Sequence, residues 1–474
     1  MIVHKFGGTS LGSAERFERA ADIVAAHHGR FADGAAPAET VVVVSAMSGV
    51  TSRLVAGARA AAEGRDDLCR EIKTELLARH LEAAEVLLPA GAERVSLCGL
   101  IEDRLHELER LCRSIALLGE LTARGLDAAS SFGEPLAAAI LAAALRGRGI
   151  RSRALSAAGL IVTDDRFGAA SPFREPTRRR LEEKVRPLLE KGVLPVVTGY
   201  VAATEGGVVT TLGRGGSDFS AAVIGAALGA AEVWIWSDVD GILTADPNIV
   251  PGARTLSELS YAEASALAHY GADVLHPKTI RPLAESRIPL RIVNSFNPSH
   301  PGTLIVEKPD RGRAHRPAII STTGLNLVVV GAGGDSWTPG FAARALRSLC
   351  EAGIEVLMFS QSYSEHNLNL VVRDRDGAHC LKTLGREFSG GGEPAGVRLD
   401  VKERVATVSV AGGSEWNGKG LVSHAFAALG GLGTRVIAVA QESGETGVSF
   451  CIPEAETAAA VRFLHRELGL EAER

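Results

Sequence analysis

Short runs of apolar, mostly β-branched residues alternate along the chain with longer stretches rich in Ala and Leu. The longer stretches have helical spacing, as in Ala14–His28, Gly133–Arg148 and Ser217–Leu228. The short runs are mostly apolar, as strands covered on both faces are; they include Val41–Ser45, Leu194–Thr198, Val208–Leu212 and Val233–Ser237. Ile2–Phe6 is a further strand candidate. The alternation predicts an α/β fold in which a mostly parallel sheet lies between two layers of helices.

Two regions depart from this alternation. Residues 65–120 are charged, have helical spacing and are nearly free of glycine before Gly91, which predicts a helical insertion. After a polar, proline-flanked break at 308–317, the chain repeats itself with a period of about 80 residues. Each copy is expected to run strand, Gly-rich loop, helix, strand, polar turn and strand. We predict an α/β domain over 1–307 and two βαββ-type modules over 318–395 and 401–474.

Composition and charge exclude several classes of protein. The chain of 474 residues is 46% hydrophobic and carries a net charge of −5, so it has no basic excess for nucleic acid. The most apolar segment, Phe219–Ala231, is shorter than the roughly 18 residues of a membrane span. The six cysteines lack a C-x-x-C pair, and no signal-peptide core follows Met1. We therefore expect no membrane segment, disulfide framework or zinc site, and a reduced, cytoplasmic protein.

A glycine pair follows Lys5 at the end of the first predicted strand, in the order Lys5-Phe6-Gly7-Gly8. A Gly-rich turn before a helix presents backbone N–H groups and the positive end of the helix dipole, which suits a phosphate. Lys5 adds a mobile positive charge beside that turn. The same residues also fit a plain strand–turn–helix connection.

A second glycine-rich turn, Gly213–Asp218, follows the predicted strand Val208–Leu212. Its glycines allow close backbone approach to a ligand, and Arg214 can hold a carboxylate or phosphate with two parallel hydrogen bonds. Ser217 or Asp218 can cap the next helix. A capped helix with an incidental arginine is the alternative interpretation.

Carboxylates mark two further segments. Glu134 opens a helix in Ser131–Pro135 and could accept a substrate ammonium, or could simply compensate the helix dipole. Aspartates in Trp236–Pro247 follow a strand and could bind ribose hydroxyls or a metal, or could belong to ordinary turns. We expect all four segments at strand ends of one sheet, where α/β proteins gather their ligands.

Together these segments resemble the aspartokinase family, in order and over about residues 2–306. The resemblance rests on KFGGTS (Lys5–Ser10), VSAMSGVT (Val44–Thr51), SFGE (Ser131–Glu134), TLGRGGSD (Thr211–Asp218), SDVDGI (Ser237–Ile242), TADP (Thr244–Pro247) and VLHPKTI (Val274–Ile280). It implies the three-layer α/β/α sandwich of amino-acid kinases, followed by a pair of ACT modules. One departure is Asp273, where the family usually has a lysine associated with ATP; Lys278 is a possible substitute.

The resemblance also implies an activity: ATP and L-aspartate would give ADP and 4-phospho-L-aspartate, the first step towards lysine, threonine and methionine. The attacking carboxylate, with a pKa of about 3.9, is already ionised at neutral pH, so no general base is required. Catalysis then amounts to positioning two anions and cancelling their charge. Mg²⁺ is expected to arrive with ATP, with no metal site of the protein's own.

Roles follow from the resemblance together with this charge argument. Lys5 would face the transferred phosphoryl group and Asp218 would orient it. Arg214 would hold the α-carboxylate of aspartate and Glu134 its α-ammonium, with hydrogen bonds from Ser45 and Ser217. The nucleotide side would be formed by Lys5, Gly7, Gly8, Ser237, Asp238, Leu243, Asn248 and Lys278.

The C-terminal modules look most like those of threonine-sensitive aspartokinase–homoserine dehydrogenases, through SQSYSEHN (Ser360–Asn367) and AQESGETG (Ala440–Gly447). We expect feedback inhibition by an amino acid, threonine first and lysine second, held by Gln361 and Gln441; these glutamines could instead only cap loops. The family's ACT modules imply a homodimer. Two other functions stay open at this point: a different amino-acid kinase, and an amino-acid sensor with a degenerate kinase domain.

Overall fold

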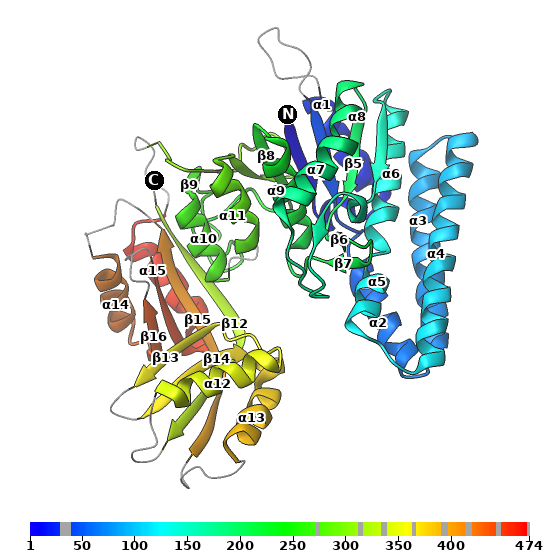
Figure 1. The fold of residues 1–474 in the computed structure, drawn as a ribbon. Coiled ribbons are helices and arrows are strands. Elements are labelled where there is room, and N and C mark those ends of the chain that lie inside the picture. Colours follow the sequence, from blue (N-terminus) through cyan, green and yellow to red (C-terminus); the bar gives the residue numbers. More distant parts are fainter. Residues whose placement is uncertain are drawn as a thin grey trace. The chain divides into compact units, whose positions relative to one another are not determined.

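The computed structural model describes residues 1–28, 39–271, 275–310, 316–332, 339–362, 366–389, 397–412, 420–441 and 447–471. They form two compact units (Figure 1). The first unit comprises Met1–Ile242, Ser257–Tyr261 and Val274–Pro309, and the second comprises Leu243–Leu256, Ala262–Asp273 and Asp310–Arg474.

The first unit is built on an eight-stranded sheet in the order β3-β5-β2-β1-β8-β10-β11-β9. All neighbouring strands run parallel except the antiparallel pair β10 and β11, so the predicted mostly parallel sheet is confirmed. Lys5 lies on a central strand, paired with Val43 and Ile235. The strands are β1 (Ile2–Phe6), β2 (Thr40–Val44), β3 (Ser152–Leu155), β5 (Leu194–Thr198), β8 (Glu232–Ser237), β9 (Glu258–Ser260), β10 (Leu290–Asn294) and β11 (Thr303–Val306).

Helices cover both faces of this sheet. One apolar core joins α1 and α6 to β2 and β5, whereas on the other face Gly225 of α9 packs closely against Val233 of β8 and Leu283 of α11. The helices of this unit are α1 (Ala14–His27), α2 (Val50–Ala62), α3 (Asp66–Leu87), α4 (Ala92–Leu118), α5 (Ala123–Ser130), α6 (Gly133–Gly147), α7 (Arg174–Lys184), α8 (Arg186–Glu190), α9 (Gly216–Leu228) and α11 (Pro277–Ser286), with 3₁₀ turns η1 (Thr9–Leu11) and η2 (Ala157–Gly159).

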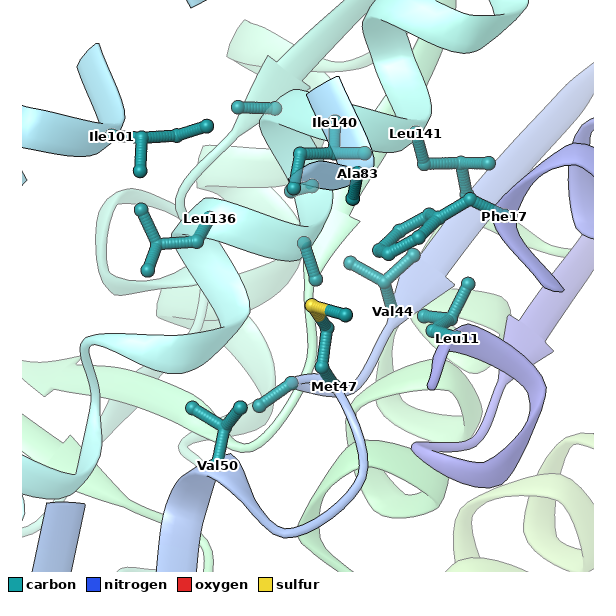
Figure 2. Close-up of a cluster of buried hydrophobic side chains, with 14 of the residues drawn as sticks. Leu11, Phe17, Val44, Met47, Val50, Ala83, Ile101, Leu136, Ile140 and Leu141 are labelled. Carbon is teal, nitrogen blue, oxygen red and sulfur yellow. The ribbon is translucent and has the colours of Figure 1, made fainter. Parts of the chain in front are cut away.

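Helix α6 is buried around nearly its whole circumference, because the sheet covers one side and α3 and α4 cover the other. Figure 2 shows Leu136 and Ile140 of α6 beside Ile101 of α4, with Leu141 near Phe17 of α1. Residues 123–147 are long and apolar enough to span a membrane by composition, but 78% of their most apolar part is buried inside the protein. Burial of this kind is typical of a core helix.

Helices α3 and α4 form the helical insertion that the sequence predicts, side by side in Figure 1. A disulfide between Cys69 and Cys112 joins them, with the two Cα atoms 6.8 Å apart. The expectation that the cysteines form no disulfide is therefore wrong for this pair. No spacing motif signals this bond, because the two residues are 43 positions apart and meet only through the helical hairpin.

A second correction concerns the glycine-rich segment that contains Arg214. The strand before it, β7 (Val209–Thr211), forms an antiparallel pair with β6 (Val201–Thr204), and β6 pairs with β4 (Val162–Thr163) in a separate three-stranded sheet. In addition, Glu134 follows a helix rather than a strand. The expectation that all four segments lie at strand ends of one sheet is therefore wrong for these two.

The second unit contains a six-stranded antiparallel sheet in the order β13-β14-β12-β15-β17-β16. Gln361 pairs with Leu368 and Gln441 with Val448, so the two glutamines occupy equivalent places in the repeat. Each copy adds a helix after its last strand. The elements are β12 (Pro317–Ala332), α12 (Pro339–Glu351), β13 (Met358–Ser362), β14 (Asn367–Arg373), α13 (Asp374–Ser389), β15 (Val397–Gly412), α14 (Leu421–Leu432), β16 (Ala438–Gln441), β17 (Gly447–Pro453), η5 (Glu454–Glu456) and α15 (Thr457–Glu467), with α10 (Tyr261–His269) beginning at its border.

The first residue of α6 is a position where only glycine fits. A Cβ atom on Gly133 would lie 2.6 Å from Cβ of Ala46 and 3.0 Å from a methyl carbon of Val50. Gly133→Ala should lower the free energy of unfolding by about 1–3 kcal/mol through overpacking, measured by urea denaturation. Gly147→Ala, at the other end of the same helix and with open space around it, should be neutral or stabilising. Equal losses in the two variants would contradict this packing argument.

Candidate active site

The ammonium of Lys5 is held by a carboxylate from a distant part of the chain. Lys5 Nζ lies 2.5 Å from Asp218 Oδ1, and the two side chains are only 9% and 15% exposed. Lys5 comes from β1, whereas Asp218 comes from the first turn of α9. The predicted contact between these residues is present, and it fixes a positive charge at the carboxyl end of the central strand. Asp218 therefore pairs with Lys5, and neither it nor Ser217 caps α9, whose N-cap is Gly215.

The glycine pair after Lys5 is tightly packed. The N–H group of Gly7 donates a 3.3 Å hydrogen bond to the carbonyl of Trp236, and a Cβ on Gly7 would lie 3.5 Å from Lys5 Nζ. A Cβ on Gly8 would lie 3.1 Å from the carbonyl of Ala46. Gly7 thus gives close access to the ammonium, while its amide is engaged with the neighbouring strand rather than directed at a phosphate.

Glu134 lies on the other side of the loop that contains Ala46. Its side chain, 2% exposed, accepts hydrogen bonds from the backbone N–H groups of Glu134 and Ala46. Its second oxygen, Oε2, is buried and has no hydrogen-bond partner among the described residues. Burial raises the pKa of Glu134 to about 8, against the lowering effect of the two backbone donors. A buried carboxylate oxygen without a partner suits a cationic ligand group.

The second glycine-rich turn is shaped by two residues with positive φ. Gly213 has φ +74° and Gly215 has φ +69°, and a Cβ on them would lie 2.8 Å from the carbonyl of Gly168 and 2.5 Å from Cβ of His276. This backbone presents Arg214 at the surface.

Ser45 and Ser217 reach the same edge of the sheet from different elements. Ser45 directly follows β2 and donates its N–H to the carbonyl of Phe6, next to the Lys5 position. Ser217 is buried against Gly199, on which a Cβ would lie 2.6 Å from Cβ of Ser217, and Gly199 donates its N–H to the carbonyl of Val44. The ends of β1, β2 and β5 are therefore surrounded by five of the predicted residues: Lys5, Asp218, Glu134, Ser45 and Ser217.

The residues predicted for the nucleotide side are spread more widely. Ser237, the last residue of β8, donates a 3.2 Å hydrogen bond to Asp238 Oδ1. Lys278 is exposed on α11, where it lines a surface hollow with Arg281. Leu243 and Asn248 belong to the second unit, and Asp273 lies outside the described residues.

Sequence reasoning missed the residues that support this edge. Asp127 is buried and accepts hydrogen bonds from the N–H of Gly168 and from both the N–H and hydroxyl of Thr211, which fixes the start of the second glycine-rich turn. The hydroxyl groups of Ser10 and Ser295 share a 2.8 Å hydrogen bond, which ties the segment after Gly7 and Gly8 to the segment after β10. A lone acidic residue in the short helix α5 is the local signal that could have pointed to Asp127.

The chemistry of these side chains suits a small zwitterion beside an anion. Glu134 offers a buried acceptor for an ammonium, Arg214 offers a donor fork for a carboxylate, and Lys5 offers a fixed cation for a phosphoryl group. The described residues contain no group of three His, Cys, Asp or Glu side chains that could hold a metal ion.

The fold and the site define the class: an amino acid kinase with C-terminal ACT modules. Residues 1–294 match the amino acid kinase family, and residues 327–388 and 408–468 match the ACT domain. Aspartokinase 1, chloroplastic, of Arabidopsis thaliana is 33% identical over 474 residues, which cover 98% of this chain and 79% of the relative. Bifunctional aspartokinase/homoserine dehydrogenase 1, chloroplastic, of Zea mays is 32% identical over 98% of this chain. The chain belongs to the aspartokinase family, and it spans 50% of that bifunctional relative.

Solved structures agree with this assignment. The fold is similar to that of E. coli aspartokinase III in complex with aspartate and ADP, with a TM-score of 0.78 and 28% identity over 99% of this chain and 100% of the other. The same enzyme in complex with lysine and aspartate gives a TM-score of 0.77 at 28% identity, over 99% of each chain.

The buried Glu134 predicts a pH-dependent cost to stability. Its pKa of about 8 in the folded chain lies above the value of about 4.3 of an exposed glutamate, so its contribution to stability is full below about pH 4.3 and is lost as the pH rises through about 8. Glu134→Gln should therefore gain stability over the wild type as the pH rises across that window, by an amount on the order of a few kcal/mol. Urea denaturation at several pH values measures this difference. Glu205→Gln, at an exposed position, is the control, and a pH-independent difference for Glu134→Gln would contradict the assignment.

Proposed function

We propose that this chain is an aspartate kinase, which transfers the γ-phosphoryl group of ATP to the side-chain carboxylate of L-aspartate. The observation that carries the proposal is the convergence of the Lys5–Asp218 pair and the buried, partly unpartnered Glu134 on either side of the loop at Ala46. Aspartate and ADP bound to E. coli aspartokinase III support the choice of substrates.

The main barrier in this reaction is repulsion between an aspartate carboxylate and the ATP phosphates. Lys5 lowers this barrier because its charge faces the transferred group from a fixed place. Asp218 holds the ammonium in place, which makes it a positioning residue. The nucleophile is ionised at neutral pH, so the site requires charge compensation rather than a general base.

Three groups would orient the amino acid. Arg214 pairs with the α-carboxylate, Glu134 accepts from the α-ammonium, and the hydroxyls of Ser45 and Ser217 complete the hydrogen bonds. Binding of the ammonium drives Glu134 towards its ionised form, so part of the binding free energy is spent on removing its proton near neutral pH. The arrangement favours a substrate with both α-groups free.

ATP would enter from the side of the glycine pair, with Mg²⁺ bound to its phosphates as part of the substrate. Gly7 and Gly8 allow the phosphates to approach Lys5 closely, and Ser237 and Asp238 lie at the end of the adjacent strand. The remaining nucleotide-side residues are assigned by family resemblance alone; they are Leu243, Asn248 and Lys278.

Substitutions of Lys5 and of Arg214 should change different kinetic parameters. Lys5→Ala should lower kcat about 100-fold or more with the fold intact, because it removes a preorganised charge that acts on the transferred group. Arg214→Ala should mainly raise the KM for aspartate, by about 10- to 100-fold, with little change in the KM for ATP. A kinase assay that traps the acyl phosphate with hydroxylamine measures kcat and the two KM values. The exposed Lys191→Ala and Arg153→Ala serve as controls. Near-normal turnover of Lys5→Ala, or unchanged aspartate saturation of Arg214→Ala, would contradict these roles.

We also propose feedback control by an amino acid at the C-terminal modules, with boundaries at 318–395 and 401–474. Gln361 and Gln441 are exposed at equivalent positions on the two edge strands β13 and β16. Equivalent edge positions suit recognition of the backbone groups of an amino acid. Lysine bound to E. coli aspartokinase III supports an amino-acid effector, with threonine as the first candidate here and lysine as the second. Pairing of the ACT modules into a homodimer and a cytoplasmic location are part of the same proposal.

Threonine or lysine should inhibit the kinase, and Gln361→Ala or Gln441→Ala should move the inhibition curve to about tenfold higher effector concentration, because one uncharged hydrogen-bonding group is lost. Titration of each amino acid into the kinase assay measures this shift. The chain has no other glutamine, so the control is the amide variant Asn326→Ala, on the same sheet but on the central strand β12. Inhibition by neither amino acid would overturn the proposed regulation.

A further inference from the structure

A hollow of about 530 Å³ lies on the second unit, and neither of the two glutamines lines it. Helices α12 to α15 pack on one face of the six-stranded sheet, against Val408, Val372 and Phe450. The residues next to these three along the strands point to the opposite face, and they form the floor of the hollow. Its wall is formed by Tyr270 and Gly271, which follow α10. The volume is in the range of small-molecule pockets.

The floor of this hollow is rich in hydroxyl groups. Thr322 pairs with Thr407, and Ser409 pairs with Ser449, so these side chains point to the same face of the sheet. Ser409 and Ser449 are buried and share a 2.6 Å hydrogen bond between their hydroxyls. Because two hydroxyls have two protons and use only one in that bond, the other remains to be donated to a further acceptor.

One cation completes the hollow. Arg373, at the end of β14, lines it, and its Nε atom is buried without a hydrogen-bond partner among the described residues. Its ionic contact to Glu355 Oε2, at 3.6 Å, is too long for a hydrogen bond, and that carboxylate is 62% exposed. No acidic residue occurs among the described residues that line the hollow. The polar atoms that line the hollow therefore favour a ligand group that is a negatively charged hydrogen-bond acceptor.

Apolar side chains flank the cation. Leu357, Met358 and Ala440 line the same hollow, and Met358 belongs to the apolar cluster on this face of the sheet. A phosphate ion would leave this apolar surface exposed to water, whereas a carboxylate with a short aliphatic tail would cover it.

We propose that this hollow is a binding site for a small aliphatic carboxylate, held by Arg373 and the hydroxyls of Ser409 and Ser449. The site is distinct from the positions of Gln361 and Gln441, which do not line the hollow. The guanidinium and the free hydroxyl proton hold the carboxylate, and the apolar wall selects the aliphatic tail.

The test is isothermal titration calorimetry on the full chain in the Gln361→Ala/Gln441→Ala background, so that the effector positions proposed above do not contribute. The probes are L-threonine, L-methionine, butyrate and inorganic phosphate; butyrate shows whether the ammonium is required. We expect at least one carboxylate to bind once per chain. Arg373→Gln should weaken that binding tenfold or more, and Arg375→Gln, an exposed arginine two residues away, should leave it unchanged.

A second variant guards against misfolding of Arg373→Gln. Ala440→Phe keeps the guanidinium and fills the hollow with a ring, because Ala440 pairs with Ser449 and faces the same side; it should also abolish binding. Near-UV circular dichroism checks both variants for the native fold. Binding by none of the carboxylates, binding by phosphate alone, or unchanged affinity in folded Arg373→Gln or Ala440→Phe would overturn the proposal.

Discussion

In the proposed reaction, repulsion between two anions is the constraint that the site has to overcome. The structure places a buried ammonium at the end of the central strand and pairs it with Asp218 from α9. A lysine in that place would be costly without a partner, and a carboxylate in that place would add to the repulsion without the lysine. The strand supplies rigidity and the helix supplies orientation, so neither side chain has to move to stabilise the transferred charge.

Unlike Asp218, which is paired with a cation, Glu134 is a buried carboxyl group without a charged partner among the described residues. It is buried with only backbone donors around it, and burial raises its pKa to about 8. Such a group is electrostatically costly by itself, and a cation of the right size relieves that cost. Under the proposed role, stability lost at this position would provide selectivity for an ammonium group, as is common at functional sites.

Much of this could be predicted from the sequence because the signals are local. Strands such as Leu194–Thr198 and helices such as Ala14–His27 follow from periodicity, and Lys5, Glu134 and Arg214 stand in or beside recognisable glycine-containing segments. Long-range pairings could not be predicted. The disulfide partner of Cys69, the separate sheet that contains β7 and the bonds of Asp127 to Thr211 depend on how distant segments fold together, which no local pattern encodes.

The strands β12 and β15 are each sixteen residues long, and each spans both halves of the C-terminal repeat. The first part of β12 pairs with the last part of β15, beside β17, while its second part also pairs with β14. The two modules are therefore joined by two strands that belong to both, and not only by side-chain contacts. Because both strands run through both halves of the repeat, the two modules are expected to unfold together as one cooperative unit.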